Sequence, residues 1–226
     1  MTGEHNPIAN GIAIDRFLVH DFDSFVPFYI DIFYDREPLG QCIGLSREQM
    51  DFITRTLYGR GSNFLSQRLS WIARDCSQEN RPVGIIACDD PVATGELQMS
   101  EDLNSQDLER ISVAMALLEE ISRPMQEIFA QGEGVCMHVA AVGVAPEYQG
   151  AGIATRLLQT ALSEAKKRGF RVAVAECTSP GSRMLFEKAG FARIHALSVS
   201  EFEIQGRRPL PDCNLEIHLM QKILDE

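Results

Sequence analysis

The feature of this sequence with the clearest chemistry is a glycine-rich turn between a predicted strand and a predicted helix. The apolar segment 135–144 is rich in β-branched residues and ends just before Pro146, and apolar residues recur at helical spacing from Leu157 onward. Between them, residues 150–154 read Gly-Ala-Gly-Ile-Ala. Glycine lets backbone N–H groups approach a ligand closely, and the following helix directs its unpaired N–H groups and the positive end of its dipole at the turn. The segment therefore predicts a phosphate-binding site.

This turn differs from two familiar phosphate-binding loops. A Walker loop has Gly-Lys-Ser/Thr after its last glycine, whereas this chain has Ile153-Ala154-Thr155 there and offers no lysine to a γ-phosphate. A dinucleotide loop has Gly-x-Gly-x-x-Gly early in a βαβ unit, whereas this turn lies late in the chain and lacks the third glycine. An ordinary strand-to-helix turn, with small residues that serve packing alone, is the remaining alternative.

Composition limits the class of protein. The 226 residues suit a single domain, residues 1–226. The net charge of −11 argues against a nucleic-acid partner, which requires clustered Lys and Arg. No stretch approaches the roughly 20 apolar residues of a membrane span, and residues 1–10 lack the apolar core of a signal peptide, so we expect a cytoplasmic protein without a membrane partner. The six cysteines form no Cys-x-x-Cys pair and no ligand spacing with histidines, so we expect free thiols and no metal site.

Hydrophobic periodicity predicts a mixed α/β fold, with hairpin strands first and a parallel β–α–β unit late. Pro38 is expected to end the first helix within segment 35–39, and the polar segment 89–105 is expected to be an irregular, mobile loop. Ser46 is the expected N-cap of the second helix, and Pro124 is expected to kink the third. The expected helices are 22–33, 48–57, 106–129, 156–168 and 182–188, and the expected strands are 12–19, 70–74, 83–88, 135–144, 172–177, 194–199 and 215–220.

The glycine-rich turn resembles the acyl-CoA loop of the GCN5-related N-acetyltransferases, whose pattern is Gln/Arg-x-x-Gly-x-Gly/Ala. Here the pattern is met by Gln149, Gly152 and Ala154, after a strand ending Val-x-Val-x-Pro. A second segment, residues 186–191, reads Phe-Glu-Lys-Ala-Gly-Phe and is similar to the family's Tyr-Glu-Lys-x-Gly-Phe. With the order of elements, the resemblance covers nearly the whole chain. It implies the family's fold, a central mixed β-sheet flanked by helices, and acetyl-CoA as cosubstrate.

The resemblance assigns the cosubstrate contacts to one strand and the turn that follows it. The strand would pair with the pantetheine arm and offer a backbone N–H to the thioester oxygen. Its residues are Val142, Gly143 and Val144. The pyrophosphate would accept hydrogen bonds from the turn and the helix start, formed by Gln149, Gly150, Ala151, Gly152, Ile153, Ala154 and Thr155.

Residues 33–39, Phe-Tyr-Asp-Arg-Glu-Pro-Leu, resemble the Asp-Glu-Pro-Leu motif of insect-type arylalkylamine N-acetyltransferases, which acetylate dopamine, serotonin, octopamine and tryptamine. Arg36 departs from the motif, whereas Glu37, Pro38 and Leu39 match it. The resemblance implies direct acetyl transfer, in a ternary complex, to a small primary amine, with Glu37 as the base that removes the amine proton directly or through water. Without the resemblance, Glu37 would be interpreted as a solvated loop carboxylate.

The donor of a proton to the departing thiolate is left open. Many family members place a tyrosine where this chain has Phe186, which cannot donate a proton. The insect-type group has a serine-rich turn at the position of residues 177–182, so Thr178 and Ser182 are the candidates, as relays or as groups that position water. Ser182 could equally be a helix N-cap.

For several other side chains, a structural role is at least as expected as a catalytic or substrate-binding role. His138, His195 and His218 lie in apolar strands, where a hydrogen-bonded core or edge histidine is the commoner outcome. The aromatic residues Phe33, Tyr34 and Phe64 could line an aryl pocket or belong to the core.

The alternative functions are transfer to a polyamine or protein lysine, and a non-catalytic acyl-CoA-binding sensor. The expected assembly is a monomer or a homodimer.

Overall fold

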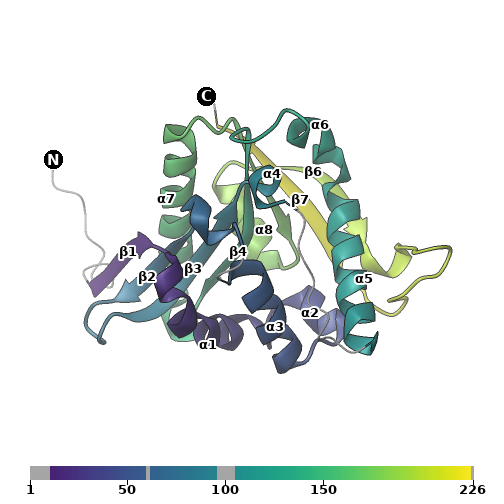
Figure 1. The fold of residues 1–226 in the computed structure, drawn as a ribbon, viewed down its shortest axis with the longest axis horizontal. Coiled ribbons are helices and arrows are strands. Elements are labelled where there is room, and N and C mark those ends of the chain that lie inside the picture. The colour runs from purple at the N-terminus through teal and green to yellow at the C-terminus, as the bar shows by residue number, and fades with distance from the viewer. Residues whose placement is uncertain (1–10, 60–61, 96–104, 225–226) are drawn as a thin grey trace.

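A seven-stranded mixed β-sheet forms the centre of the part of the chain that the structure describes (Figure 1). This computed structural model describes residues 11–59, 62–95 and 105–224. The strands follow the spatial order β1-β2-β3-β4-β5-β7-β6, and neighbours are antiparallel except for β4 and β5. Their bounds are β1 (Ile12–Arg16), β2 (Trp71–Asp75), β3 (Arg81–Asp89), β4 (Cys136–Val144), β5 (Val172–Cys177), β6 (Ala192–Ser198) and β7 (Glu216–Ile223).

Local signals set most helix ends. Ser46 caps the third helix by accepting from the Gln49 N–H, while the Gln49 side chain accepts from the Ser46 N–H. Pro124 lies in a 3-10 turn that separates two helices, as the expected kink implied. The helices are α1 (Phe22–Phe33), α2 (Pro38–Ile43), α3 (Arg47–Tyr58), α4 (Pro91–Thr94), α5 (Ser105–Ser122), α6 (Gln126–Phe129), α7 (Ile153–Lys167) and α8 (Pro180–Lys188).

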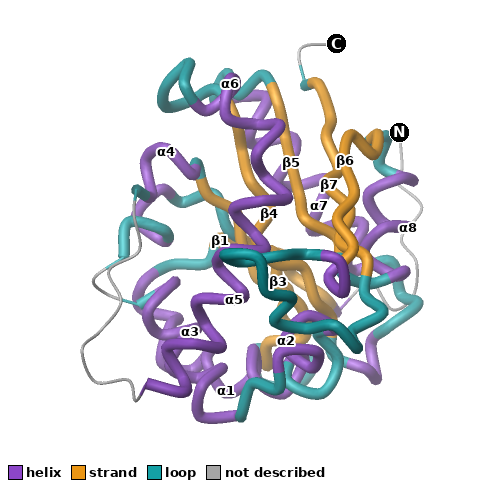
Figure 2. The backbone as a smooth tube through the Cα atoms, turned by 90° about the vertical axis from the view of Figure 1, so that its right-hand side faces the viewer, coloured by secondary structure: helices purple, strands orange, loops and turns teal. Residues whose placement is uncertain are grey.

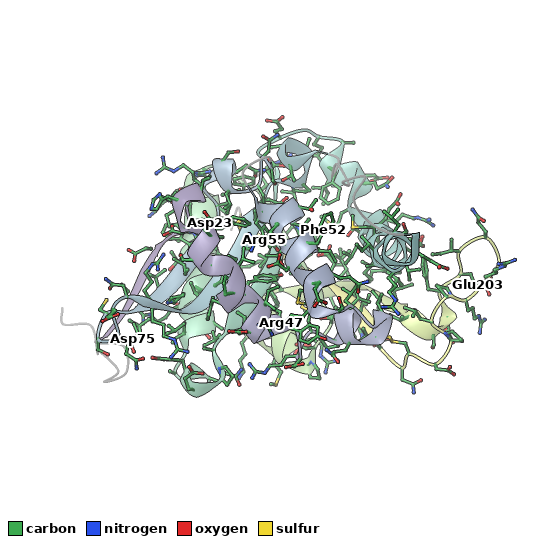
Figure 3. The ribbon with its side chains drawn as sticks, turned by 60° about the horizontal axis from the view of Figure 1, so that its bottom comes forward. Asp23, Arg47, Phe52, Arg55, Asp75 and Glu203 are labelled. Atoms are coloured by element: carbon green, nitrogen blue, oxygen red, sulfur yellow. A yellow bond between two sulfur atoms is a disulfide. The ribbon has the colours of Figure 1, made fainter. Side chains whose placement is uncertain are left out.

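Helices cover both faces of the sheet. On one face, α7 and α8 bury Leu157, Leu158 and Phe186 against the strands. The other face is covered by α1, α2, α3 and α5 (Figure 2), and two separate apolar clusters lie there. One cluster lies beneath α1 and α3, and the other lies beneath α2 and α5. Figure 3 shows α1 and α3 side by side, with Asp23 labelled on α1 and Arg55 on α3. Within the described residues, no helix combines the length and the apolar content that crossing a membrane requires.

The two central strands separate after a short parallel ladder. β4 and β5 pair only from Cys136↔Val172 to His138↔Val174. Beyond that point β4 continues to Val144 on β3, and β5 continues to Cys177 on β7. Among the described residues, one edge of β4 therefore has no strand partner from Val139 onward.

The predicted mixed fold is confirmed, but two segments were predicted wrongly. Segment 35–39 was expected only to end a helix, whereas α2 begins there. Pro38 occupies its first turn, where a missing N–H costs nothing, and Glu37 caps it. The segment expected to be an irregular loop, 89–105, contains α4, and residues 96–104 lie outside the described residues.

The cysteines also differ from expectation, because Cys42 and Cys213 form a disulfide rather than free thiols. Their Cα atoms are 5.9 Å apart, and the bond links α2 to the segment before β7 across 171 residues of sequence. Cys76, Cys88, Cys136 and Cys177 are free. Sequence spacing could not identify the pair, because a long-range disulfide has no spacing rule.

Cys42→Ser and Cys213→Ser are each expected to lower the free energy of unfolding by roughly 2–5 kcal/mol, because the bond closes a long loop in the unfolded chain. Urea unfolding monitored by circular dichroism measures this change. Cys76→Ser is the control, since Cys76 is exposed and free. Unfolding curves of all three variants that coincide with that of the wild type would contradict a stabilising role.

Candidate active site

Glu37 is held at a helix end rather than in a solvated loop. Its N–H donates to the carbonyl of Phe33 at 2.8 Å, so the chain turns directly from α1 into α2. Its carboxylate accepts from the N–H groups of Leu39, at 3.1 Å, and Gly40. A third donor, the hydroxyl of Thr178, lies 2.9 Å from Oε1. The carboxylate is therefore fixed in direction as well as in place.

The structure brings Thr178 to Glu37 but not Ser182. Thr178 follows β5 directly and donates to Glu37 across 141 residues of sequence. The N-cap of α8 is Ser179, whose hydroxyl accepts from the Ser182 N–H, and the Ser182 hydroxyl donates back to the Ser179 carbonyl at 2.9 Å. Of the two predicted hydroxyls, one contacts the candidate base and the other serves a capping box.

Thr178→Val keeps the shape of the side chain and removes its hydroxyl, so kcat is expected to fall about tenfold, the loss of one hydrogen bond to a charged group. Ser182→Ala is the matched control and is expected to leave kcat within about twofold while costing about 1 kcal/mol of stability. Steady-state kinetics with urea unfolding separates the two effects. Equal losses of kcat in both variants would show that contact with Glu37 does not distinguish the hydroxyls.

The glycine-rich turn leaves space in front of the start of α7. Gly150 and Gly152 have positive φ values of 79° and 75°, and a Cβ at either position would meet nothing within 4 Å. The first main-chain bond of α7 runs from the Arg156 N–H to the Gly152 carbonyl. The N–H groups of residues 153–155 therefore lie at the helix end without intrahelical acceptors, and the two glycines keep the adjoining turn free of side chains, which suits an anion.

The predicted strand segment lies against the helix that carries Glu37. In β4, Val142 pairs with Ile86 and Val144 with Gly84, so β3 occupies one edge of the segment. Gly143 lies beneath the last turn of α1, since a Cβ there would be 2.7 Å from Cζ of Phe33 and 2.9 Å from Cδ1 of Ile32. This contact fixes the end of α1, and hence the turn to Glu37, over the open part of β4.

An aromatic group extends from Glu37 along α1. Phe33 lies 4.5 Å, between ring centroids, from Tyr29, and Tyr29 packs edge-on against Tyr58 at 5.6 Å. Tyr58 donates a hydrogen bond to the Tyr29 hydroxyl, and burial raises the pKa of Tyr29 to about 12, so both phenols remain neutral. Phe64 is 3% exposed and belongs to the core, whereas Phe33 and Tyr34 are partly exposed.

A buried ionic group lies where β4 and β5 separate. His138 Nδ1 is 2.9 Å from Oδ1 of Asp89, and Nε2 is 2.7 Å from Oε2 of Glu176. Burial lowers the pKa of His138, but the Glu176 and Asp89 carboxylates outweigh it and raise that pKa well above 6.5. The resulting stabilisation is full below the ordinary histidine pKa and is lost as the pH rises through the raised pKa of the folded state.

Three other residues noted from the sequence, Phe186, His218 and His195, do not lie at the open edge of β4. Phe186 is 2% exposed and packs against Phe191 on the α7 face. His218 is buried with Nε2 3.0 Å from Oε2 of Glu216, and burial lowers its pKa. His195 lies in β6, at the far edge of the sheet. The sequence pattern therefore singled out these residues but could not show where they lie relative to Glu37.

Buried thiols do not provide an obvious nucleophile. Burial raises the pKa of Cys136 and Cys177 to about 12 and raises that of Cys88 well above its usual range. The thiolate, which is the reactive form, is therefore scarce in all three at neutral pH.

Comparison with known proteins identifies a family and several structures with a similar fold. The model of the acetyltransferase (GNAT) family matches residues 48–191. The C-terminal condensation domain of Ebony, solved with beta-alanyl-dopamine, has a TM-score of 0.79 at 16% identity, covering 94% of this chain and 98% of that one. Arylalkylamine N-acetyltransferase 2 from Aedes aegypti has a TM-score of 0.73 at 16% identity, covering 96% and 100%.

A third similar structure acts on a different amine. The Drosophila melanogaster polyamine N-acetyltransferase, which catalyses formation of N-acetylagmatine, has a TM-score of 0.69 at 18% identity, covering 94% of this chain and 99% of that one. At these identities the likeness shows a shared fold.

Proposed function

Because this chain belongs to the acetyltransferase (GNAT) family, we propose that it transfers the acetyl group of acetyl-CoA to a small primary amine, with arylalkylamines as the preferred class. The observation that carries the proposal is the fixed Glu37 carboxylate, which directly follows the helix end that lies over Gly143 of β4. Two backbone N–H groups and Thr178 hold it, and Phe33 holds the preceding helix end over Gly143.

The chain fits acetyl-CoA at two places. The space before Gly150 and Gly152, faced by the first amides of α7, suits the pyrophosphate. The partnerless edge of β4 at residues 142–144 suits the pantetheine arm, which can add to it as a strand would. The two places are consecutive in sequence, so a single extended molecule can occupy both.

In the proposed reaction the tasks are divided among Glu37, a backbone N–H of β4 and Thr178. Glu37 accepts the proton of the ammonium form, directly or through one water, and frees the amine lone pair. A backbone N–H of β4 stabilises the negative oxygen of the tetrahedral intermediate. Thr178 orients Glu37 and can relay a proton. As the C–S bond breaks, the nitrogen loses its second proton, which passes to the departing thiolate directly or through water. The high pKa values of the buried thiols support direct transfer over an acetyl-cysteine intermediate.

The preference for aryl amines rests on the aromatic group beside the base. Phe33 and Tyr29 lie one helical turn apart on α1, and Glu37 follows Phe33 by four further residues. An acceptor whose amine is near Glu37 can place an aromatic ring against these side chains, where ring pairs contribute about 0.5–1.5 kcal/mol beyond area burial.

Initial rates of CoA thiol release test the proposal, with acetyl-CoA and tryptamine both varied. Direct transfer predicts intersecting double-reciprocal lines, whereas parallel lines would indicate a covalent acetyl-enzyme. Tight CoA binding without thiol release for any amine would instead favour the acyl-CoA sensor.

A further inference from the structure

The backbone provides no link between β4 and β5 beyond their third register pair. The last pair is His138↔Val174, and past it each strand is bonded only to its outer neighbour. A side-chain contact crosses the gap at this point, because His138 of β4 reaches Glu176 of β5 at 2.7 Å.

This contact belongs to a chain of four side chains from four elements. Asp89 of β3 bonds the other ring nitrogen of His138, and Ser122 of α5 donates to the second oxygen of Glu176 at 2.8 Å. Both ring nitrogens face carboxylates, so both donate, and the ring is an imidazolium. The Asp89, Glu176 and His138 side chains are 6%, 12% and 22% exposed. Their contacts are therefore largely shielded from solvent, and as charge-assisted hydrogen bonds they are directional.

The β5 end of this chain leads to the candidate base. Thr178 follows the last residue of β5 and is two positions after Glu176, so a short stretch of chain joins the two side chains. Thr178 donates to Glu37, while Glu176 is tied to His138. A change in the separation of β4 and β5 at Glu176 therefore moves the donor that orients Glu37 relative to the strand segment 142–144.

We propose that His138 is a positioning residue, which links β5 to β4 where main-chain pairing stops and so fixes the distance between the acetyl-CoA edge of β4 and the Thr178–Glu37 pair. This inference rests on the proposed acetyl transfer for its catalytic consequence, but its structural part does not. An imidazolium that already carries a proton on each nitrogen, and donates a hydrogen bond from both, cannot accept the amine proton. His138 therefore acts by holding the two strands together rather than as a base.

The test compares His138→Leu, which removes both contacts, with the double variant H138Q/D89N. In the double variant the amide introduced at position 89 can donate to the side-chain carbonyl introduced at position 138. The side-chain amide at position 138 can in turn donate to Glu176, so an uncharged chain replaces the ionic one. His195→Leu is the matched control, since it changes a histidine in a strand distant from the gap. Glu176→Leu removes the contact from the β5 side and is the second variant if H138L does not fold.

Hydrogen exchange of residues 139–144 and 175–178 is the first readout, and it does not depend on turnover. H138L, or E176L if H138L does not fold, is expected to speed exchange there at least tenfold, whereas H138Q/D89N and H195L stay within about threefold of the wild type. Exchange unchanged in H138L, or in E176L where that variant replaces it, overturns the proposal even if no amine is turned over.

The kinetic readout separates positioning from proton transfer. H138L is expected to lower kcat at least tenfold, and H138Q/D89N to restore it to within about threefold of the wild type. A double variant as inactive as H138L, with wild-type exchange rates, would assign the imidazole a direct chemical role and overturn positioning. Wild-type protein that turns over no amine would instead remove the proposed function and leave the exchange result standing.

Discussion

Replacing Glu37 with glutamine is expected to lower kcat by a factor of roughly 10² to 10⁴, the usual contribution of a positioned general base. The glutamine side chain can still accept one hydrogen bond at the start of α2, but it cannot take a proton from the amine. The acid limb of the pH–rate profile, which reports ionisation of an essential base, is expected to flatten in the variant. Thiol release from about pH 5.5 to about pH 9 measures both effects.

The expected fall in kcat must be separated from the effect of losing a helix cap, because Glu37 also caps α2. Ser46→Ala removes the cap of the neighbouring helix α3 and is the matched control, with an expected cost of about 1 kcal/mol and little change in kcat. Wild-type kcat and an unchanged pH profile in Glu37→Gln would exclude Glu37 from the chemistry.

Gly143→Ala is expected to lower kcat at least tenfold, although a methyl group carries no chemistry. The new Cβ would lie 2.7 Å from Cζ of Phe33, so the last turn of α1 must move, and the turn to Glu37 moves with it. Overpacking of this kind costs about 1–3 kcal/mol, and misplacing a reacting group by about 1 Å can cost a hundredfold in rate.

The double variant G143A/F33L tests that mechanism. Leucine shortens the side chain that the new methyl group meets, so stability and kcat are expected to recover together, at least in part. Kinetics and urea unfolding of the two single variants and the double variant give the coupling. If F33L does not relieve G143A, the contact of the methyl group with Phe33 is not the cause of the loss.

Signals that act within one turn of chain were sufficient for most of the fold. Ser46 predicted the start of α3 and Pro124 the break between α5 and α6. Pro38 misled, because the same residue that ends one helix can occupy the first turn of the next. The separation of β4 and β5 after three pairs has no sequence signal, since apolar β-branched residues suit a paired or an open strand equally.

The candidate site was less predictable because its contacts join distant residues. Glu37 and Thr178 were predicted separately by resemblance, and the hydrogen bond between them crosses 141 residues. The His138 contacts join residues 38 and 49 positions apart, and each carboxylate on its own resembles an ordinary surface charge. Partners of this kind follow from the topology of the sheet, which single-sequence periodicity does not specify.

The central claim, acetyl transfer with preference for aryl amines, is tested most directly by comparing kcat/KM across a panel of acceptors. The panel contains tryptamine, serotonin, dopamine and octopamine beside spermidine, agmatine and a lysine peptide, with CoA thiol release as the readout and mass spectrometry of the acetylated product. We predict that the aryl amines are the best substrates and that Glu37→Gln loses activity on all of them. A higher kcat/KM for spermidine, agmatine or the peptide would contradict the aryl preference, and no acetylated product from any amine would contradict the transfer itself.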